Sequence, residues 1–222
     1  MSMRYRRAIL LSLPLSLTVA ICSAQKHIEV DTGECGSDMP IKATATKSAV
    51  FNDKVSGIRA YGVVLYQRST REGAEGHCHV IYKLFAADAG RPFQPLKQID
   101  REMDDGQIAG IELIGLSPDK TKLAANFWIA EGDSQLHVPV VYDRSTKSAS
   151  YLALEDRIQK RIHGCDQVED FIGVTNTGEA VFTIPPSRYS DTPECGDKGV
   201  WRFNLKTGRV YQVAKISGDK WQ

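Results

Sequence analysis

The stretch Leu116-Ser117-Pro118-Asp119-Lys120-Thr121-Lys122-Leu123-Ala124 decides the fold that we predict for this chain of 222 residues. Its Pro-Asp pair favours a tight turn, and the apolar residues on both sides favour strands. The stretch therefore predicts a β-hairpin, with one strand ending at Leu116 and the next beginning at Leu123. A second strand, turn and strand follow in residues 140–152, so we expect four antiparallel strands in succession.

The same pattern recurs along the chain at a nearly constant spacing. Residues 172–182 match residues 114–124 in residue type, 58 positions later. The segment around Phe203 repeats the one around Tyr142, which in turn repeats the one around Phe85. A fixed long period marks a repeat architecture. We predict one domain, residues 25–222, that contains three units at about residues 49–98, 108–154 and 165–216.

A four-stranded antiparallel unit with a Ser-Pro-Asp turn, here Ser117-Pro118-Asp119, resembles the blades of TolB-like and WD40-like β-propellers, whose turn is of the Ser-Pro-Asp-Gly type. The resemblance implies an all-β fold: a small or incomplete propeller-like array of antiparallel sheets, either a four-bladed ring or an open arc. A β-sandwich is the alternative, because it explains strands and turns but not the shared period. We expect strands near residues 27–30 and 41–46 to complete or cap the array. Residues 152–162 predict a short helix.

The first 24 residues have the pattern of a signal peptide. Arg4, Arg6 and Arg7 precede an apolar run that extends from residue 8 to residue 21, and the small residue Ala24 offers a cleavage site. The run is shorter than the roughly 20 apolar residues of a membrane-spanning helix. We therefore expect a periplasmic or extracellular protein, with no membrane insertion after cleavage.

Four cysteines follow the expected cleavage site: Cys35, Cys78, Cys165 and Cys195. An even number of cysteines in an exported chain is typical of disulfides, and four cysteines allow three pairings. We favour Cys35–Cys78 with Cys165–Cys195, because each pair brackets one predicted unit. The absence of a Cys-x-x-Cys motif disfavours a redox motif or structural zinc.

The charge and the glycine pattern exclude several classes of partner. The net charge is +1, and removal of the three arginines at the amino terminus would change it to −2. A nearly neutral chain gives no electrostatic reason to expect nucleic acid as a partner. No glycine-rich phosphate-binding loop occurs, and we expect no cofactor.

Two patterns invite a chemical interpretation, and in both a structural interpretation is favoured. Ser117 lacks the Gly-x-Ser-x-Gly elbow of serine hydrolases and is expected to be a turn residue. His77 and His79 would share one face of a strand, which suits a transition metal. No third ligand is identified, and Cys78 is needed for a disulfide, so we expect no metal site. The acidic residues 100–106 do not fit the spacing of an EF-hand and indicate a solvated linker.

The binding surface is predicted from the position of the long connections. They recur at the same place in each unit: residues 68–77, 130–136 and 185–198. Insertions on one side of a repeat commonly form a binding surface. The third connection carries Arg188, Tyr189 and Asp191, and Arg and Tyr are favoured interface anchors. The alternative is a surface loop without a binding role.

The leading hypothesis is an exported, non-catalytic protein-binding module that uses this loop surface. In size and export the chain resembles the periplasmic immunity proteins that block effectors of bacterial secretion systems, which implies an inhibitor of a partner enzyme. One alternative is an enzyme for envelope carbohydrate or peptide, with carboxylates among Asp104, Asp105, Glu131 and Asp133. The other alternative is a structural accessory of an envelope complex.

Overall fold

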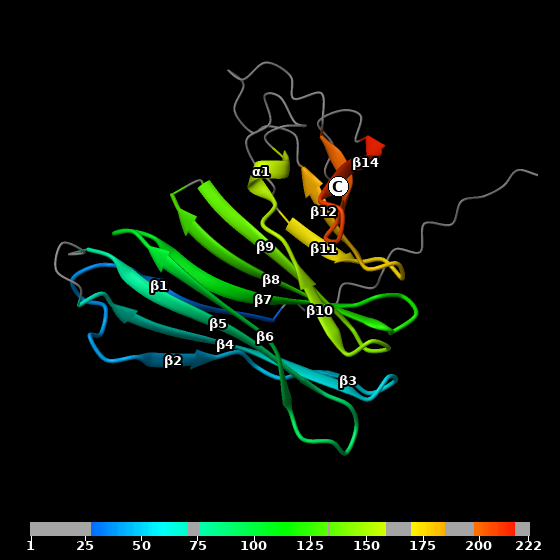
Figure 1. Cartoon of the computed structure of the whole chain (residues 1–222), viewed down its shortest axis with the longest axis horizontal. Coiled ribbons are helices and arrows are strands. Elements are labelled where there is room, and N and C mark those ends of the chain that lie inside the picture. Colours follow the sequence, from blue (N-terminus) through cyan, green and yellow to red (C-terminus); the bar gives the residue numbers. More distant parts are fainter. Residues whose placement is uncertain (1–27, 71–75, 133, 159–169, 185–197, 216–222) are drawn as a thin grey trace, which may run out of the picture.

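The computed structural model describes residues 28–70, 76–132, 134–158, 170–184 and 198–215. Within these ranges the chain forms antiparallel strands and one short helix, α1 (Glu155–Ile158), which lies inside the segment predicted to be helical. The strands make three sheets, which lie one above the other in Figure 1. The all-β prediction is confirmed. The sheets pack face to face as in a sandwich, and none closes into a barrel.

The first sheet is the lowest layer in Figure 1 and has the order β2-β4-β5-β6, with β3 also paired to β4. Its strands are β2 (Thr44–Lys47), β3 (Phe51–Asp53), β4 (Ile58–Arg68), β5 (Cys78–Ala87) and β6 (Gln94–Met103). Side chains of β4 and β5 alternate between buried and half-buried positions along most of each strand. One face of the sheet is therefore buried and the other is accessible.

The middle sheet contains the hairpin that the Pro-Asp turn predicts. Its strands are β1 (Ile28–Glu34), β7 (Ile108–Leu116), β8 (Lys122–Glu131), β9 (Ser134–Asp143) and β10 (Ser148–Tyr151). Strands β7 to β10 pair in chain order and confirm the four predicted antiparallel strands. β1 pairs with the free edge of β7, with Val30 opposite Ile111, and so extends the four-stranded unit.

The third sheet repeats the four-stranded unit. Its strands are β11 (Asp170–Val174), β12 (Glu179–Ile184), β13 (Gly199–Asn204) and β14 (Arg209–Lys215), again paired in chain order. Its two tight hairpins lie where the repeat places them, at the β11–β12 and β13–β14 connections.

Two apolar cores hold the three sheets together. The first core, which includes Tyr82, Leu84 and Phe127, lies between the first and middle sheets. The second core, which includes Phe171 and Phe182, lies between the middle and third sheets. The middle sheet is thus covered on both faces, which explains why consecutive residues of β7 and β8 are apolar.

The structure corrects two predictions about connections. The long connection predicted at residues 130–136 is a tight turn: Glu131 pairs with Ser134, and Gly132 adopts a positive φ of 53°. The predicted linker at residues 100–106 is half strand, because β6 continues to Met103, whose side chain is fully buried. In both places strand pairing with a neighbour overrides a locally polar composition.

The stack has two ends. The turn end carries the tight hairpin turns that precede β4, β8, β10, β12 and β14. The loop end carries the connections between β1 and β2, β4 and β5, β6 and β7, and β8 and β9. The predicted Cys35–Cys78 disulfide is present at the loop end, whereas Cys165 and Cys195 lie outside the described residues. No described helix is long and apolar enough to cross a membrane.

Candidate functional site

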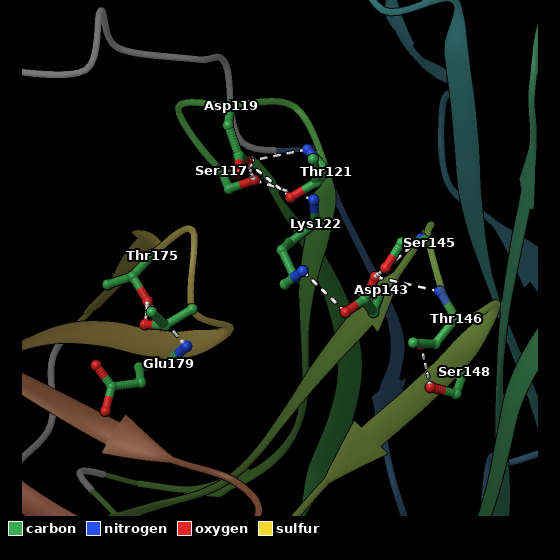
Figure 2. Close-up of polar contacts among 11 residues, drawn as sticks. Ser117, Asp119, Thr121, Lys122, Asp143, Ser145, Thr146, Ser148, Thr175 and Glu179 are labelled. Carbon is green, nitrogen blue, oxygen red and sulfur yellow. Dashed lines mark hydrogen bonds and ion pairs between the residues drawn. The ribbon is translucent and has the colours of Figure 1, made fainter.

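The turn that includes Ser117 is organised by hydrogen bonds between its own residues (Figure 2). The Ser117 hydroxyl donates to Oδ1 of Asp119 at 2.6 Å and accepts the backbone N–H of Lys122 at 3.0 Å. Thr121 donates both its N–H and its hydroxyl to the same carboxylate oxygen. The bond from Ser117, followed by those from Thr121, holds the pKa of Asp119 below its usual range. Ser117 is fully buried and serves as a turn residue, as predicted.

Other turns at this end repeat the same chemistry. The Thr175 hydroxyl accepts the N–H of Glu179 at 3.0 Å, as Ser117 does for Lys122. Before β10, Asp143 accepts the N–H of Ser145 at 2.9 Å. Asn204 and Asp53 accept backbone N–H groups two residues ahead in the same way. These side chains therefore stabilise the turns by accepting backbone hydrogen bonds.

Polar contacts also tie the three sheets together at the turn end. The Arg144 guanidinium reaches from the middle to the first sheet, where it binds the Ser56 carbonyl and the Asp88 carboxylate. Asn176 of the third sheet accepts the N–H of Asp119 at 3.1 Å. The hydrogen-bonding capacity of this end is used within the protein, which favours a structural role.

A cleft opens between the middle and third sheets at the turn end, with about 440 Å³ of space, open solvent included. Its wall contains the ion pair between Lys122 Nζ and Asp143 Oδ2, 2.8 Å apart. The Lys122 ammonium, and next the Ser145 hydroxyl, lower the pKa of Asp143 below its usual range. A carboxylate held in this state is a poor proton acceptor, which disfavours Asp143 as a general base.

The loop end is organised around the disulfide. The Cys35 N–H donates to the Gln107 carbonyl at 2.7 Å, and the Gly106 N–H donates to the Cys35 carbonyl at 2.9 Å. Cys78 opens β5, so the disulfide fixes both connections against the first sheet. Cys35 and Cys78 are each 1% exposed, which makes the disulfide a structural one.

Side chains extend this organisation to the surface. His77 Nδ1 lies 3.0 Å from Asp104 Oδ1, and the Asp104 side chain is 68% exposed. The Gln107 amide donates to Glu131 Oε2 at 3.1 Å and accepts the Asp104 N–H at 2.9 Å. Asp105 is exposed beside them. Four connections, from different parts of the sequence, thus form one polar surface.

Only some of the site residues predicted from the sequence lie on this surface. Asp104, Asp105 and Glu131 share the loop end, whereas Asp133 lies outside the described residues. Cys78 is used in the disulfide, and within the described part of the chain no group of three or more His, Cys, Asp or Glu residues is placed to hold a metal ion. The residues proposed to bind a partner, Arg188, Tyr189 and Asp191, lie outside the described ranges.

Sequence reasoning missed the connections at residues 34–38 and 104–107 as parts of this surface. The available signal was the pairing of Cys35 with Cys78, because that pairing brings the start of β5 to the end of β1. The β6–β7 connection follows, since β6 pairs with β5 and β7 pairs with β1.

Comparisons of the chain with protein-family models, with curated proteins and with solved structures found no match.

Proposed function

We propose that this chain is an exported, non-catalytic module that binds a partner protein through its loop end. The observation that carries the proposal is the cross-linked loop end: a buried disulfide and backbone hydrogen bonds hold its connections, while charged side chains face solvent. A surface that is rigid before binding loses little conformational entropy when a partner docks. The turn end, by contrast, uses its polar groups internally.

The charge of the loop end indicates the kind of partner surface that fits it. Among the residues that the structure describes at this end, exposed carboxylates exceed exposed cations. The carboxylates that face solvent at this end are Glu34, Asp38, Asp104, Asp105 and Glu131. A partner with a basic patch would be attracted and oriented by this surface. Arg188, Tyr189 and Asp191 are proposed as further contacts, on the basis of sequence alone.

The finer proposal is a periplasmic immunity or inhibitor protein that blocks a partner enzyme, built on a propeller-like array of sheets. The disulfide agrees with an oxidising compartment, where such bonds persist. An enzyme that uses Asp104, Asp105 and Glu131 is less favoured, because Glu131 accepts a bond from Gln107 and Asp104 pairs with His77 on an exposed surface. Catalytic carboxylates more often lie in a cleft that excludes water.

The test is affinity capture from an envelope extract of the organism that encodes the chain. The wild-type chain is expected to retain one stoichiometric partner. Asp104→Lys with Glu131→Lys should abolish retention, and Arg188→Ala with Tyr189→Ala should weaken it. Asp170→Lys, at an exposed position of β11, is the control and should retain the partner. Retention that is equal in all four proteins, or turnover of envelope glycan or peptide by the pure chain, contradicts the proposal.

A further inference from the structure

The two faces of the first sheet are both apolar, although the described residues cover only one of them. The covered face of β4 and β5 carries Val64, Val80 and Leu84, each with no exposed surface. The opposite face, here called the outer face, carries half-buried apolar residues at the alternate positions. They are Tyr61, Val63, Leu65, Ile81 and Phe85. Strands that are apolar on both faces are typical of sheets that are covered on both sides.

The apolar side chains of the outer face form one continuous surface. Val63 lies opposite Lys83, and Leu65 lies opposite Ile81 on the neighbouring strand. Tyr61 stacks on Phe85 with ring centroids 4.9 Å apart, and Phe93 contacts the edge of the same cluster at 4.8 Å. A contiguous apolar patch on a sheet, with polar residues around it, is characteristic of a protein interface.

Two lysines lie at one edge and in the centre of this patch, and two carboxylates lie at its other edge. Lys47 sits over the Tyr61 ring, 3.8 Å from its centroid, and Lys83 is half-buried in the centre. Asp100 and Glu102 are exposed on the edge strand β6. Within the described residues, none of these four side chains pairs with an opposite charge.

The register of the sheet relates the two pairs of charges geometrically. Asp100 is one strand away from Lys83 and two residues further along, because Lys83 lies opposite Gln98. Glu102 is three strands away from Lys47 and four residues further along. The vector from Lys47 to Glu102 is therefore nearly parallel to the vector from Lys83 to Asp100. Neighbouring strands lie about 4.8 Å apart, and residues along a strand lie about 3.4 Å apart. With these spacings, one line in the plane of the sheet passes through the midpoint between Lys83 and Asp100 and through the midpoint between Lys47 and Glu102. The line is nearly perpendicular to the vector that joins the two residues of each pair.

That line has the property of a two-fold axis between two copies of the chain. The line passes beside Leu65 and Ile81, so rotation about it lays these residues and Val63 of each copy on the outer face of the other, while Tyr61 and Phe85 lie beyond the overlap. The same rotation places Lys83 beside Asp100 of the second copy and Lys47 near its Glu102, and each contact occurs twice. An interface of this kind, in which one surface is complementary to itself, is the usual basis of a closed dimer.

We propose that the outer face of the first sheet is the interface of a homodimer. A partner of uniform charge fits this face less well, because it would meet repulsion on one side of the patch. The inference concerns the outer face and not the loop end, so it goes beyond the proposed function. Two loop ends in one particle would also allow bivalent binding.

The first test is sedimentation velocity of the full chain over a range of concentrations. The wild-type protein is expected to be dimeric at about 100 μM, well above the dissociation constant of a specific interface of standard size. Val63→Asp places a carboxylate in the centre of the patch and should raise that constant at least about 30-fold. Val181→Asp, on the accessible face of the third sheet, is the matched control and should leave it unchanged.

The second test exchanges the charges. One variant carries Lys47→Glu and Lys83→Glu, and the other carries Asp100→Lys and Glu102→Lys. Each variant alone should be monomeric, whereas an equimolar mixture should form a heterodimer as stable as the wild type. Lys147→Glu with Lys206→Glu, at exposed positions in the turns before β10 and β14, gives the same change in net charge as the first variant and is the control. A monomeric wild type, a dimer that tolerates Val63→Asp, or a mixture that stays monomeric would each overturn the proposal.

Discussion

The first and third sheets flank the same middle sheet, yet their accessible faces differ in chemistry. On the third sheet the accessible face carries polar contacts around Glu179. Its carboxylate accepts the Tyr211 hydroxyl at 2.9 Å and the Asn204 amide at 3.4 Å, and Arg202 lies 3.8 Å away. On the first sheet the corresponding face is largely apolar, and its charged side chains Lys47, Lys83, Asp100 and Glu102 form no ion pair within the described residues.

The difference shows which face needs a cover. Polar groups that satisfy one another lose nothing when water surrounds them, so the third sheet is complete as it stands. Removing half-buried apolar side chains from water lowers the free energy by about 25 cal/mol for each Å² of apolar surface that is buried. The outer face of the first sheet therefore favours association, and the same architecture produces one face suited to solvent and one suited to a second copy.

The two outer sheets also differ in how they are attached to the middle sheet. Cys35 follows β1 of the middle sheet, and Cys78 opens β5 of the first sheet, so a covalent bond joins these two layers. Cys35→Ala with Cys78→Ala should lower the free energy of unfolding by about 4 kcal/mol, because the closed loop spans 43 residues. Urea unfolding at neutral pH measures the loss. A decrease of less than about 1 kcal/mol contradicts this assignment.

A pair of neighbouring valines compares the two faces of the first sheet directly. Val64 has no exposed surface, whereas Val63 is half-buried on the outer face. Val64→Ala should cost about 2 kcal/mol of stability, because it leaves a cavity in the first core. Val63→Ala should cost about 0.5 kcal/mol when measured at protein concentrations low enough to dissociate a dimer. Equal costs would mean that the outer face is covered within one chain.

Two carboxylates test the contrast between the accessible faces. Glu179→Ala removes three polar contacts on the third sheet and should cost about 1.5 kcal/mol. Asp100→Ala on the first sheet removes one bond, from the Gln98 amide at 3.3 Å, and should change the stability of dilute protein by less than about 0.5 kcal/mol. Thermal unfolding of both variants at one concentration gives the comparison. A larger loss for Asp100→Ala reverses the interpretation of the two faces.

Much of this architecture is predictable from sequence because its determinants are local. The Pro118-Asp119 turn and the alternation of the flanking strands specify the β7–β8 hairpin, and the repeat extends the prediction to the third sheet. Turn chemistry of this kind acts within a few residues, so one chain suffices to recognise it.

The rest depends on contacts between distant residues. Nothing local to β1 indicates that it pairs with β7, or that the β8–β9 connection closes in a tight turn at Gly132. The candidate surface at the loop end combines Cys35, Asp104 and Glu131, which only the sheet pairings bring together. The apolar run of residues 60–66 is typical of a strand that is covered on both sides, but only the structure shows that the described residues cover one face.

The smallest expected effect concerns an ion pair of the middle sheet, between neighbouring strands β8 and β9, at the cleft beneath the third sheet. Lys122 and Asp143 line the cleft beneath that sheet, and the pKa of Asp143 lies below its ordinary value of 3.8 in the folded protein. A carboxyl whose pKa is lowered by folding contributes stability above its ordinary pKa, and that contribution is lost as the pH falls through the folded value. Asp143→Asn should therefore cost about 1 kcal/mol at pH 7, and the cost should shrink as the pH falls below about 4.

Lys122→Met removes the ion pair but leaves the hydrogen bonds that Asp143 accepts in its turn. It therefore separates the two contributions of Asp143. If the ammonium is the main cause of the lowered pKa, Asp143→Asn should cost less and depend less on pH in the Lys122→Met background. Urea unfolding of the four proteins from pH 7 to about pH 3 completes the cycle. A pH-dependent cost of Asp143→Asn that Lys122→Met leaves unchanged would assign the lowered pKa to the hydrogen bonds from Ser145 in the turn alone.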